Sequence, residues 1–266
     1  MISEARGARR YAVVSGKGGV GKTVLTANLA AALAASGKRT LVVDADLGLA
    51  NLDIILGVNP RHTLMDVVRG TASASEVIMP TSGGFDLLPA GSGLVEGTML
   101  TPSLAGTLEA LLGSLDANYD LIFFDAGAGI GEVVLYFARL AHEILLVVTP
   151  EPTSIMDAYA TIKIMARLYQ KTEFGLIVNL GNPTHPAQTG SAVARHLQQV
   201  ISKFLSVGGQ ATVRLNLIGS VPRDSAVPQT ISRQQLLVQT DSHAPFSRSI
   251  HQLAAALANK ELSVAP

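Results

Sequence analysis

A glycine-rich stretch at positions 15–23 has the residue types that bind phosphate. Its sequence, S-G-K-G-G-V-G-K-T, matches the pattern G-x-x-x-x-G-K-[ST]. In such a loop, backbone N–H groups surround an anion, the lysine reaches the β and γ phosphates, and the hydroxyl ligates Mg2+. We therefore expect a nucleotide and Mg2+ here, the alternative being a glycine-rich turn that binds nothing. The residues expected to contact the nucleotide are Gly16, Lys17, Gly18, Gly19, Val20, Gly21, Lys22, Thr23 and Val24.

Three aspartates form a second set of residues that could do chemistry. Asp44 ends the apolar run 40–43, Asp46 comes two residues later, and Asp125 follows the apolar run 121–124. Carboxylates at the carboxyl ends of parallel strands lie near the ligand crevice, so Thr23, Asp44 and Asp125 are the expected magnesium-side residues. Asp46 can orient an attacking water, and the alternative for both early aspartates is a helix-capping or turn role. The small residues at 126–131 suit a loop that responds to a γ phosphate, or simply a permissive turn.

The elements that must position these residues alternate between strand and helix. The strand at 11–14 precedes the phosphate loop, and a helix at 24–36 follows it and ends at Gly37. Further strands are predicted at 40–44, 85–88, 121–125, 143–149, 174–179 and 214–220. Further helices are predicted at 63–70, 101–118, 189–207 and 244–259, with another opening at 150–159 and a loop at 180–188. This order predicts an α/β fold with a single doubly wound, mainly parallel sheet flanked by helices.

Length and composition limit the classes of protein that fit. The 266 residues are 48% hydrophobic and 15% charged, which suits one α/β domain at 11–259 between a short extension, 1–10, and a short tail, 260–266. Lys plus Arg and Asp plus Glu are balanced at 20 each, so there is no strong nucleic-acid signal. Cysteine is absent, which excludes disulfides and thiolate-held metal centres. His185 has no second histidine at ligand spacing, so we do not expect it to bind a metal. No uncharged apolar run is long enough to span a membrane, and we expect a cytoplasmic protein.

The phosphate loop and the first aspartates together resemble those of one ATPase family. The forms K-G-G-V-G-K-T at 17–23 and D-A-D-L-G-L-A-N-L-D at 44–53 are similar to the deviant P-loop and switch I of the MinD/ParA ATPases, and the resemblance covers roughly 11–258. It implies ATP and Mg2+ as cofactors and an ATP-dependent homodimer, in which Lys17 reaches the partner's phosphates. It implies catalytic roles for Lys17, Lys22 and Asp46, with Asp44 and Asp125 on the magnesium side. It also implies that Asn179 reads the adenine edge and that Pro222, in the loop 221–224, packs against the base.

Two further stretches resemble the FlhG/FleN (YlxH) group of flagellar-number regulators more than MinD itself. These are D-A-G-A-G-I at 125–130, with Gly127 where MinD has proline, and P-E-P-T-S-I-M-D-A-Y at 150–159. The resemblance implies a slow, partner-stimulated ATPase that regulates the placement or number of flagella. Its expected partners are an SRP-type GTPase, a basal-body C-ring protein or a flagellar transcription activator. It also suggests that Glu151 or Asp157 pairs with Lys17 of the other subunit.

Other functions remain open on the sequence alone. A MinD-type division-site ATPase is the main alternative, followed by a ParA-like partitioning ATPase and a non-hydrolysing nucleotide-binding scaffold. The tail at 257–266 carries one lysine and one glutamate, whereas helices that bind membrane surfaces have basic residues on their polar face. Peripheral association with the inner face of the cell membrane is therefore only weakly supported.

Overall fold

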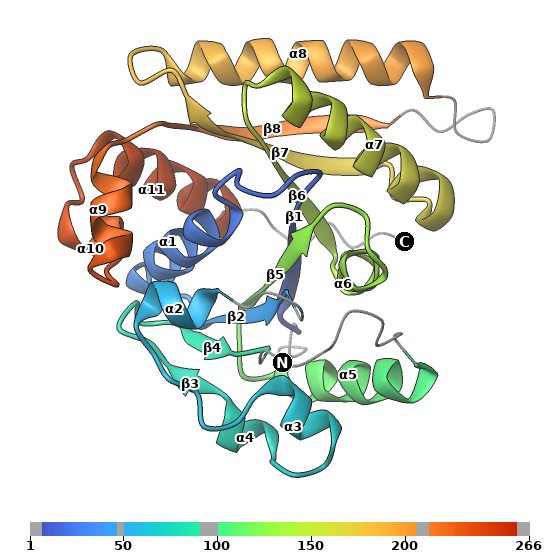
Figure 1. The fold of residues 1–266 in the computed structure, drawn as a ribbon, viewed down its shortest axis with the longest axis vertical. Helices are drawn as coiled ribbons and strands as arrows, with labels where there is room; N and C mark the ends of the chain where they lie inside the picture. Colours follow the sequence, from blue (N-terminus) through green and yellow to red (C-terminus); the bar gives the residue numbers. More distant parts are fainter. Residues whose placement is uncertain (1–6, 47–50, 91–100, 206–212, 260–266) are drawn as a thin grey trace, which may run out of the picture.

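The computed structural model describes residues 7–46, 51–90, 101–205 and 213–259. In these residues one sheet has the strand order β3-β4-β2-β5-β1-β6-β7-β8 (Figure 1). All neighbouring strands are parallel except β3 and β4, which are antiparallel. The strands are β1 (Arg9–Ser15), β2 (Thr40–Ala45), β3 (Met79–Pro80), β4 (Asp86–Leu88), β5 (Leu121–Ala128), β6 (Glu143–Val148), β7 (Glu173–Gly181) and β8 (Arg214–Pro222).

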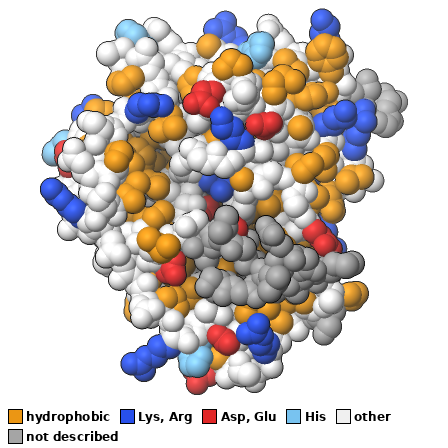
Figure 2. All heavy atoms as spheres, in the orientation of Figure 1, with side chains coloured by type: hydrophobic (Ala, Val, Ile, Leu, Met, Phe, Trp, Pro, Cys, Tyr) orange, Lys and Arg blue, Asp and Glu red, His pale blue; other side chains and the backbone are white. Residues whose placement is uncertain are grey.

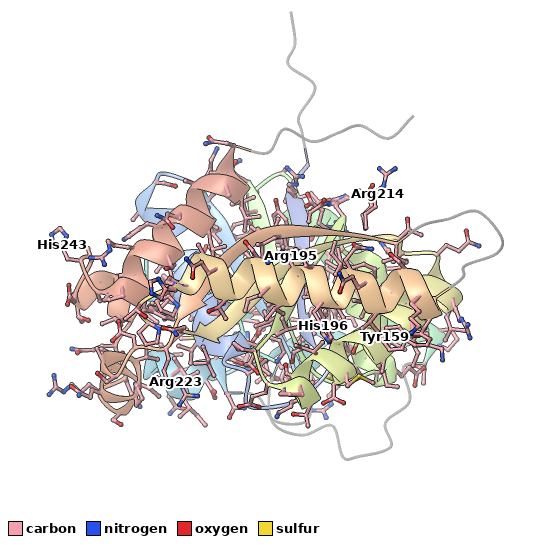
Figure 3. All side chains as sticks on the ribbon, turned by 90° about the horizontal axis from the view of Figure 1, so that it is seen from above. Tyr159, Arg195, His196, Arg214, Arg223 and His243 are labelled. Atoms are coloured by element: carbon pink, nitrogen blue, oxygen red, sulfur yellow. The ribbon has the colours of Figure 1, made fainter. Side chains whose placement is uncertain are left out.

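Helices cover both faces of this sheet, as expected for a doubly wound fold. Helices α1, α10 and α11 pack on one face, and α5 to α8 pack on the other (Figure 1). The helices are α1 (Lys22–Ala35), α2 (Leu52–Leu56), α3 (Leu64–Val68), α4 (Ala74–Val77), α5 (Pro102–Leu115), α6 (Glu132–Leu140), α7 (Pro152–Tyr169), α8 (Pro186–Phe204), α9 (Ala226–Ser232), α10 (Leu237–Thr240) and α11 (Pro245–Ala258). Seen from above, α8 runs alongside β8, and Arg214, the first residue of β8, lies far from Arg223, which follows its last residue (Figure 3).

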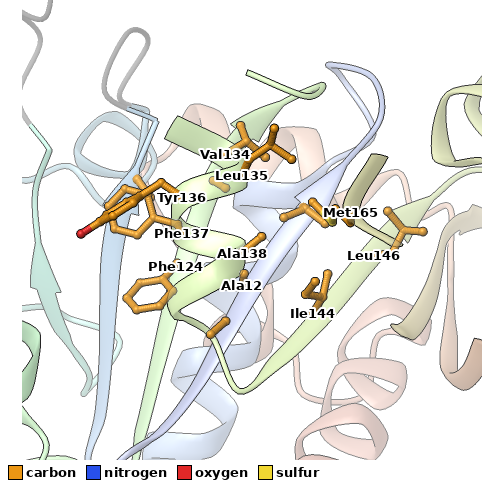
Figure 4. Packing of buried hydrophobic residues seen from close by; sticks show 14 of the residues in the cluster. Ala12, Phe124, Val134, Leu135, Tyr136, Phe137, Ala138, Ile144, Leu146 and Met165 are labelled. Atoms are coloured by element: carbon orange, nitrogen blue, oxygen red, sulfur yellow. The ribbon is translucent and has the colours of Figure 1, made fainter. Parts of the chain in front are cut away.

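The central strands are apolar because both of their faces are buried. On β5, Phe123 points to the α1 side, where it stacks on Tyr11 with ring centroids 5.2 Å apart. The next residue, Phe124, points to the other side and packs on Phe137 of α6, also at 5.2 Å (Figure 4). A parallel strand with a helix on each side therefore reads as a continuous hydrophobic run rather than an alternating one. This packing fixes the carboxyl ends of β1, β2 and β5, from which the phosphate loop and the aspartates project.

The fold class predicted from the sequence is confirmed, but several boundaries were wrong. Strand β5 continues to Ala128 instead of ending at Asp125, because Ala126 pairs with β2 and Ala128 pairs with β1. Helix α8 begins at Pro186, inside the predicted loop, since proline is well suited to the first turn of a helix; its predicted end at 207 lies outside the described residues. The short elements β3, α2, α4, α6, α9 and α10 were not predicted. All of these except α6, which has nine residues, have seven residues or fewer and are too short to show a clear period.

Candidate nucleotide-binding site

The phosphate loop connects β1 to the first turn of α1. Gly19 and Gly21 have φ of +75° and +82°, a region of backbone conformation that glycine adopts without strain. Gly21 is the N-cap of α1 and has no side chain to satisfy the first N–H groups, which leaves them available to an anion. The helix also directs the positive end of its dipole toward this point. The geometry of a phosphate-binding loop is therefore formed.

Gly16 has a packing role that the motif alone does not reveal. A Cβ atom at this position would collide with the backbone carbonyl of Asp157, so α7 approaches the loop as closely as a glycine permits. At Gly18, by contrast, the nearest atom to an added Cβ would be the Ala128 side chain at 4.0 Å. The first glycine of the motif thus allows α7 to sit on the phosphate loop.

Lys17 contacts the beginning of α7 in the same chain. Its Nζ lies 2.8 Å from Oε2 of Glu151 and 3.2 Å from Oγ1 of Thr153. The hydrogen bond from Lys17 lowers the pKa of the Glu151 carboxyl below its ordinary value. Of the two suggested acidic partners, the structure therefore brings Glu151 to Lys17 within one chain. Asp157 instead lies beside Gly16, and pairing across a dimer stays a prediction.

Asp44 and Asp125 lie side by side on neighbouring strands, in register with one another. Both are almost fully buried, at 2% exposure each. Burial and the facing Asp125 charge raise the pKa of Asp44 to about 7, although the N–H groups of Asp46 and Leu52 donate to it. Burial also raises the pKa of Asp125, against the opposing influence of Lys22 and of the Thr23 and Thr26 hydroxyls. Two buried carboxylates this close favour a cation between or beside them.

Asp46 lies at the mouth of the crevice, just beyond β2. Its backbone N–H donates to Oδ1 of Asp44 at 3.1 Å, which ties the two aspartates together. A Cβ on Gly127, two residues after Asp125 in β5, would lie 3.4 Å from the Asp46 carboxylate, so β5 passes close to Asp46 at the crevice mouth. The Gly129 N–H donates to the Ser15 carbonyl at 2.8 Å, which fixes the segment after β5 against the phosphate loop. A cavity of about 700 Å³ opens between these segments, α2 and α6.

A second, more apolar cavity of about 440 Å³ adjoins the other side of the phosphate loop. Asn179 lies in its wall at the carboxyl end of β7, and its Nδ2 donates to the Val20 carbonyl at 2.8 Å. The Oδ1 atom of Asn179 is buried and has no hydrogen-bond partner among the described residues. The predicted base-contacting residues are both in the wall, which comprises Gly19, Gly21, Val24, Asn179, Leu180, Pro222, Arg223, Asp224, Ser225, Val227, Pro228, Ile231 and Phe246.

Some residues of the site were not found by sequence reasoning. Thr26 contacts Asp125, Thr153 contacts Lys17, and Val227, Pro228 and Ile231 of α9 line the second cavity. Thr26 carried a usable signal, because a residue four positions after Lys22 in a helix lies on the same face. The α9 residues carried none, since they reach the site only through the tertiary fold.

Other kinds of site are not supported in the described parts of the chain. No cluster of three or more His, Cys, Asp or Glu side chains there is arranged to hold a metal ion, and His185 is only the N-cap residue of α8. Two carboxylates and a hydroxyl are nevertheless compatible with Mg2+, which keeps several of its waters and needs few protein ligands. Across the same ranges, none of the helices combines the length and apolar character needed to cross a bilayer.

Comparison with known proteins identifies the family. Residues 11–238 match the model of the CobQ/CobB/MinD/ParA nucleotide binding domain, and the chain belongs to this family. It is 39% identical to the antiactivator FleN of Pseudomonas aeruginosa, over 91% of this chain and 82% of FleN. It is 34% identical to the flagellum site-determining protein YlxH of Helicobacter pylori, over 94% and 81% of the two chains. It is 37% identical to the septum site-determining protein MinD of Thermotoga maritima, over 91% and 85%.

A solved structure supports the same assignment at the level of the fold. MinD of Pyrococcus horikoshii in complex with Mg-ADP superimposes with a TM-score of 0.75, at 25% identity, and covers 95% of this chain and 96% of its own. The family resemblance noted from the phosphate loop and from 44–53 is thereby confirmed, as is the particular similarity to the FleN and YlxH group. That MinD structure contains magnesium together with ADP.

Proposed function

We propose that this protein is a switch ATPase that dimerises with ATP and regulates the placement or number of flagella. The observation that carries the ATPase assignment is the meeting of three groups at one crevice. These are the formed phosphate loop, the buried Asp44–Asp125 pair, and Asp46 at the crevice mouth. Burial disfavours the charged form of both carboxylates. A scaffold that only held a nucleotide would not need this unfavourable pair, whereas an ATPase needs it to bind Mg2+.

The described residues divide the chemistry of ATP hydrolysis among them. Lys22 and the backbone N–H groups at the start of α1 would hold the β and γ phosphates. Thr23, Asp44 and Asp125 would hold Mg2+, which would supply positive charge to the phosphate oxygens. Asp46 would orient a water so that its oxygen attacks the γ phosphorus as the bond to the β-phosphate oxygen breaks, giving ADP and phosphate. Positioning and charge stabilisation provide nearly all of the catalysis in such a reaction.

The second cavity favours adenine over guanine. Asn179 uses Nδ2 for the Val20 carbonyl, so its buried Oδ1 is left to accept a hydrogen bond. The exocyclic amino group of adenine can donate to that oxygen, whereas guanine presents a carbonyl at the corresponding position. An unpaired buried acceptor is costly, so the base that satisfies it gains in affinity.

The dimer is supported by the surface around the crevice mouth. Ile54 on α2, Ile130 after β5 and Met156 on α7 are 62%, 44% and 58% exposed. Ile54 lines the larger cavity, and the other two each adjoin a residue that contacts the phosphate loop, Gly129 or Asp157. On the face drawn in Figure 2, hydrophobic side chains lie among acidic and basic ones, as at interfaces that form and separate. In the single chain, Lys17 is held by Glu151. We infer that basal hydrolysis is slow because Lys17 reaches the partner's phosphates only in the dimer, and that a partner protein accelerates it.

The flagellar role is supported by the similarity to FleN and YlxH, at 39% and 34% identity. A division-site role is supported by the similarity to MinD of Thermotoga maritima, at 37% identity. An antiactivator acts against an activator, so a flagellar transcription activator is the first partner to test. An SRP-type GTPase and a C-ring protein follow. Gly127 and the run 150–159 favour the flagellar reading over MinD.

Two experiments test this proposal. Phosphate release from Mg-ATP should be measurable in the wild-type protein and should be lost in Lys22→Ala and Asp46→Ala, while both variants keep the wild-type circular dichroism. Deleting the gene in its own host should change the number or position of flagella, and a Lys22→Ala copy should not restore it. Minicells with unchanged flagella would instead establish the division-site function.

A further inference from the structure

Thr26 connects the helix of the phosphate loop to the buried aspartate of β5. It lies in α1 and its side chain is fully buried, at 0% exposure. Its Oγ1 is 3.0 Å from the Lys22 carbonyl oxygen and 3.2 Å from Oδ1 of Asp125. The first contact is the bond to the carbonyl four residues earlier that helical threonines often make. The second has no such local explanation, because it joins two elements that are far apart in the sequence.

The Asp125 carboxylate depends on such donors, because a charged group so deeply buried has few waters to solvate it. A hydroxyl has one hydrogen to donate, so Thr26 shares it between a neutral carbonyl and a carboxylate. The carboxylate contact is the longer of the two, at 3.2 Å against 3.0 Å, but a hydrogen bond to a charged acceptor is the stronger kind. The Thr26 bond engages Oδ1, and the Thr23 hydroxyl also donates to the Asp125 carboxylate, so two hydroxyls from the first two turns of α1 hold this group.

We propose that Thr26 is a positioning residue, whose hydroxyl fixes the Asp125 carboxylate in the orientation that meets Mg2+. This inference rests on the proposed ATPase function and names a residue through which that site is controlled. Groups that orient metal-side carboxylates typically change metal affinity by about 10- to 100-fold when they are removed. Thr26 does not line either cavity, so its loss should affect metal binding and leave metal-free nucleotide binding intact.

The chain offers a closely matched control in Thr161 of α7. Thr161 is also fully buried, and its Oγ1 bonds the carbonyl four residues earlier, that of Asp157, at 2.9 Å. Among the described residues its hydroxyl donates to this carbonyl and to no carboxylate. Replacing either threonine by valine removes a hydroxyl and a helical back-bond while keeping the shape of the side chain. The two variants therefore differ chiefly in the contact to Asp125.

The experiment measures Mn2+ binding by electron paramagnetic resonance in the presence of ADP, and ADP binding in EDTA by calorimetry. Thr26→Val should weaken Mn2+ binding about 10- to 100-fold and leave ADP binding in EDTA unchanged, and Thr26→Ser should restore the metal affinity. In turnover, Thr26→Val should lower kcat at saturating ATP and shift the metal concentration needed for half-maximal rate. Thr161→Val should match the wild-type protein in all of these.

Two results would overturn the inference. One is a Thr26→Val protein that binds Mn2+ as tightly as Thr161→Val, and the other is a Thr26→Ser protein as weak as Thr26→Val. If valine at position 26 prevents folding, Thr26→Ala against Thr161→Ala makes the same comparison with smaller side chains. A wild-type protein that binds ADP but no Mn2+ would refute the proposed ATPase function itself, and the positioning role with it.

Discussion

The paired aspartates make a prediction about stability that needs no knowledge of the partner. In the metal-free protein, the pKa of Asp44 is raised from 3.8 to about 7 by burial and by the charge of Asp125. The folded protein then keeps a proton that the unfolded chain releases near pH 4. The free energy of unfolding must therefore fall as the pH rises from about 4 to about 7. Mg2+ should reverse the trend, since it binds the deprotonated pair.

The magnitude follows from the shift. Each pKa unit corresponds to about 1.36 kcal/mol, so a shift of about three units gives at most roughly 4 kcal/mol between pH 4 and pH 8. This is a large part of the 5–15 kcal/mol typical of a folded domain. Asp44→Asn removes the titration, so it should be more stable than the wild-type protein at pH 8 in EDTA and similar to it at pH 4.5. In Mg-ATP the wild-type protein should have the higher free energy of unfolding of the two.

The assay is urea unfolding followed by circular dichroism, because the chain has no tryptophan to report by fluorescence. His142 contributes in the opposite direction, since burial and Arg10 lower its pKa and so raise stability as pH increases through its titration. That contribution is the same in both proteins and cancels in the difference between them. The free energy of unfolding is plotted against pH for both proteins in EDTA. Parallel curves would mean that Asp44 does not destabilise the folded protein as the pH rises, which would contradict the raised pKa.

Three other predictions concern the loop, the base and the dimer. Gly16→Ala should lower the free energy of unfolding by about 1–3 kcal/mol, because its Cβ meets the Asp157 backbone, whereas Gly18→Ala should cost far less; urea denaturation compares them, and equal losses would contradict the packing role. Asn179→Ala should reduce the preference for ATP over GTP, measured as the ratio of the two dissociation constants, and an unchanged ratio would mean that Asn179 does not read the base. Lys17→Ala should leave the thermal stability and the ADP affinity of the monomer nearly unchanged, because the Lys17–Glu151 pair is exposed. The same variant should hydrolyse ATP more slowly. If it hydrolyses ATP at the wild-type rate, Lys17 has no catalytic role.

Much of the fold and site could be predicted because it is encoded locally. The spacing of Gly21, Lys22 and Thr23 and the apolar runs before Asp44 and Asp125 are sufficient to place the crevice at the carboxyl ends of parallel strands. The single-sheet architecture followed from the alternation of strands and helices. These features require only the residues within one or two elements.

The features that were missed depend on contacts between distant segments. The role of Gly16 becomes visible only when α7 is seen against the loop, and the Thr26–Asp125 bond only when α1 lies beside β5. Strand β5 runs past Asp125 because β2 pairs with Ala126 and β1 pairs with Ala128, which the small residues there did not suggest. Sequence reasoning finds the chemistry of single elements, and the structure supplies the positioning that joins them.

The central claim is that the protein is a switch whose dimer forms with ATP and not with ADP. The most direct measurement is the light-scattering mass of Asp46→Ala with Mg-ATP and, separately, with Mg-ADP. With hydrolysis blocked, we predict a mass about twice the 27.7 kDa of the chain in ATP and the mass of a single chain in ADP. A single-chain mass with both nucleotides, in protein shown to bind them, would contradict the switch mechanism.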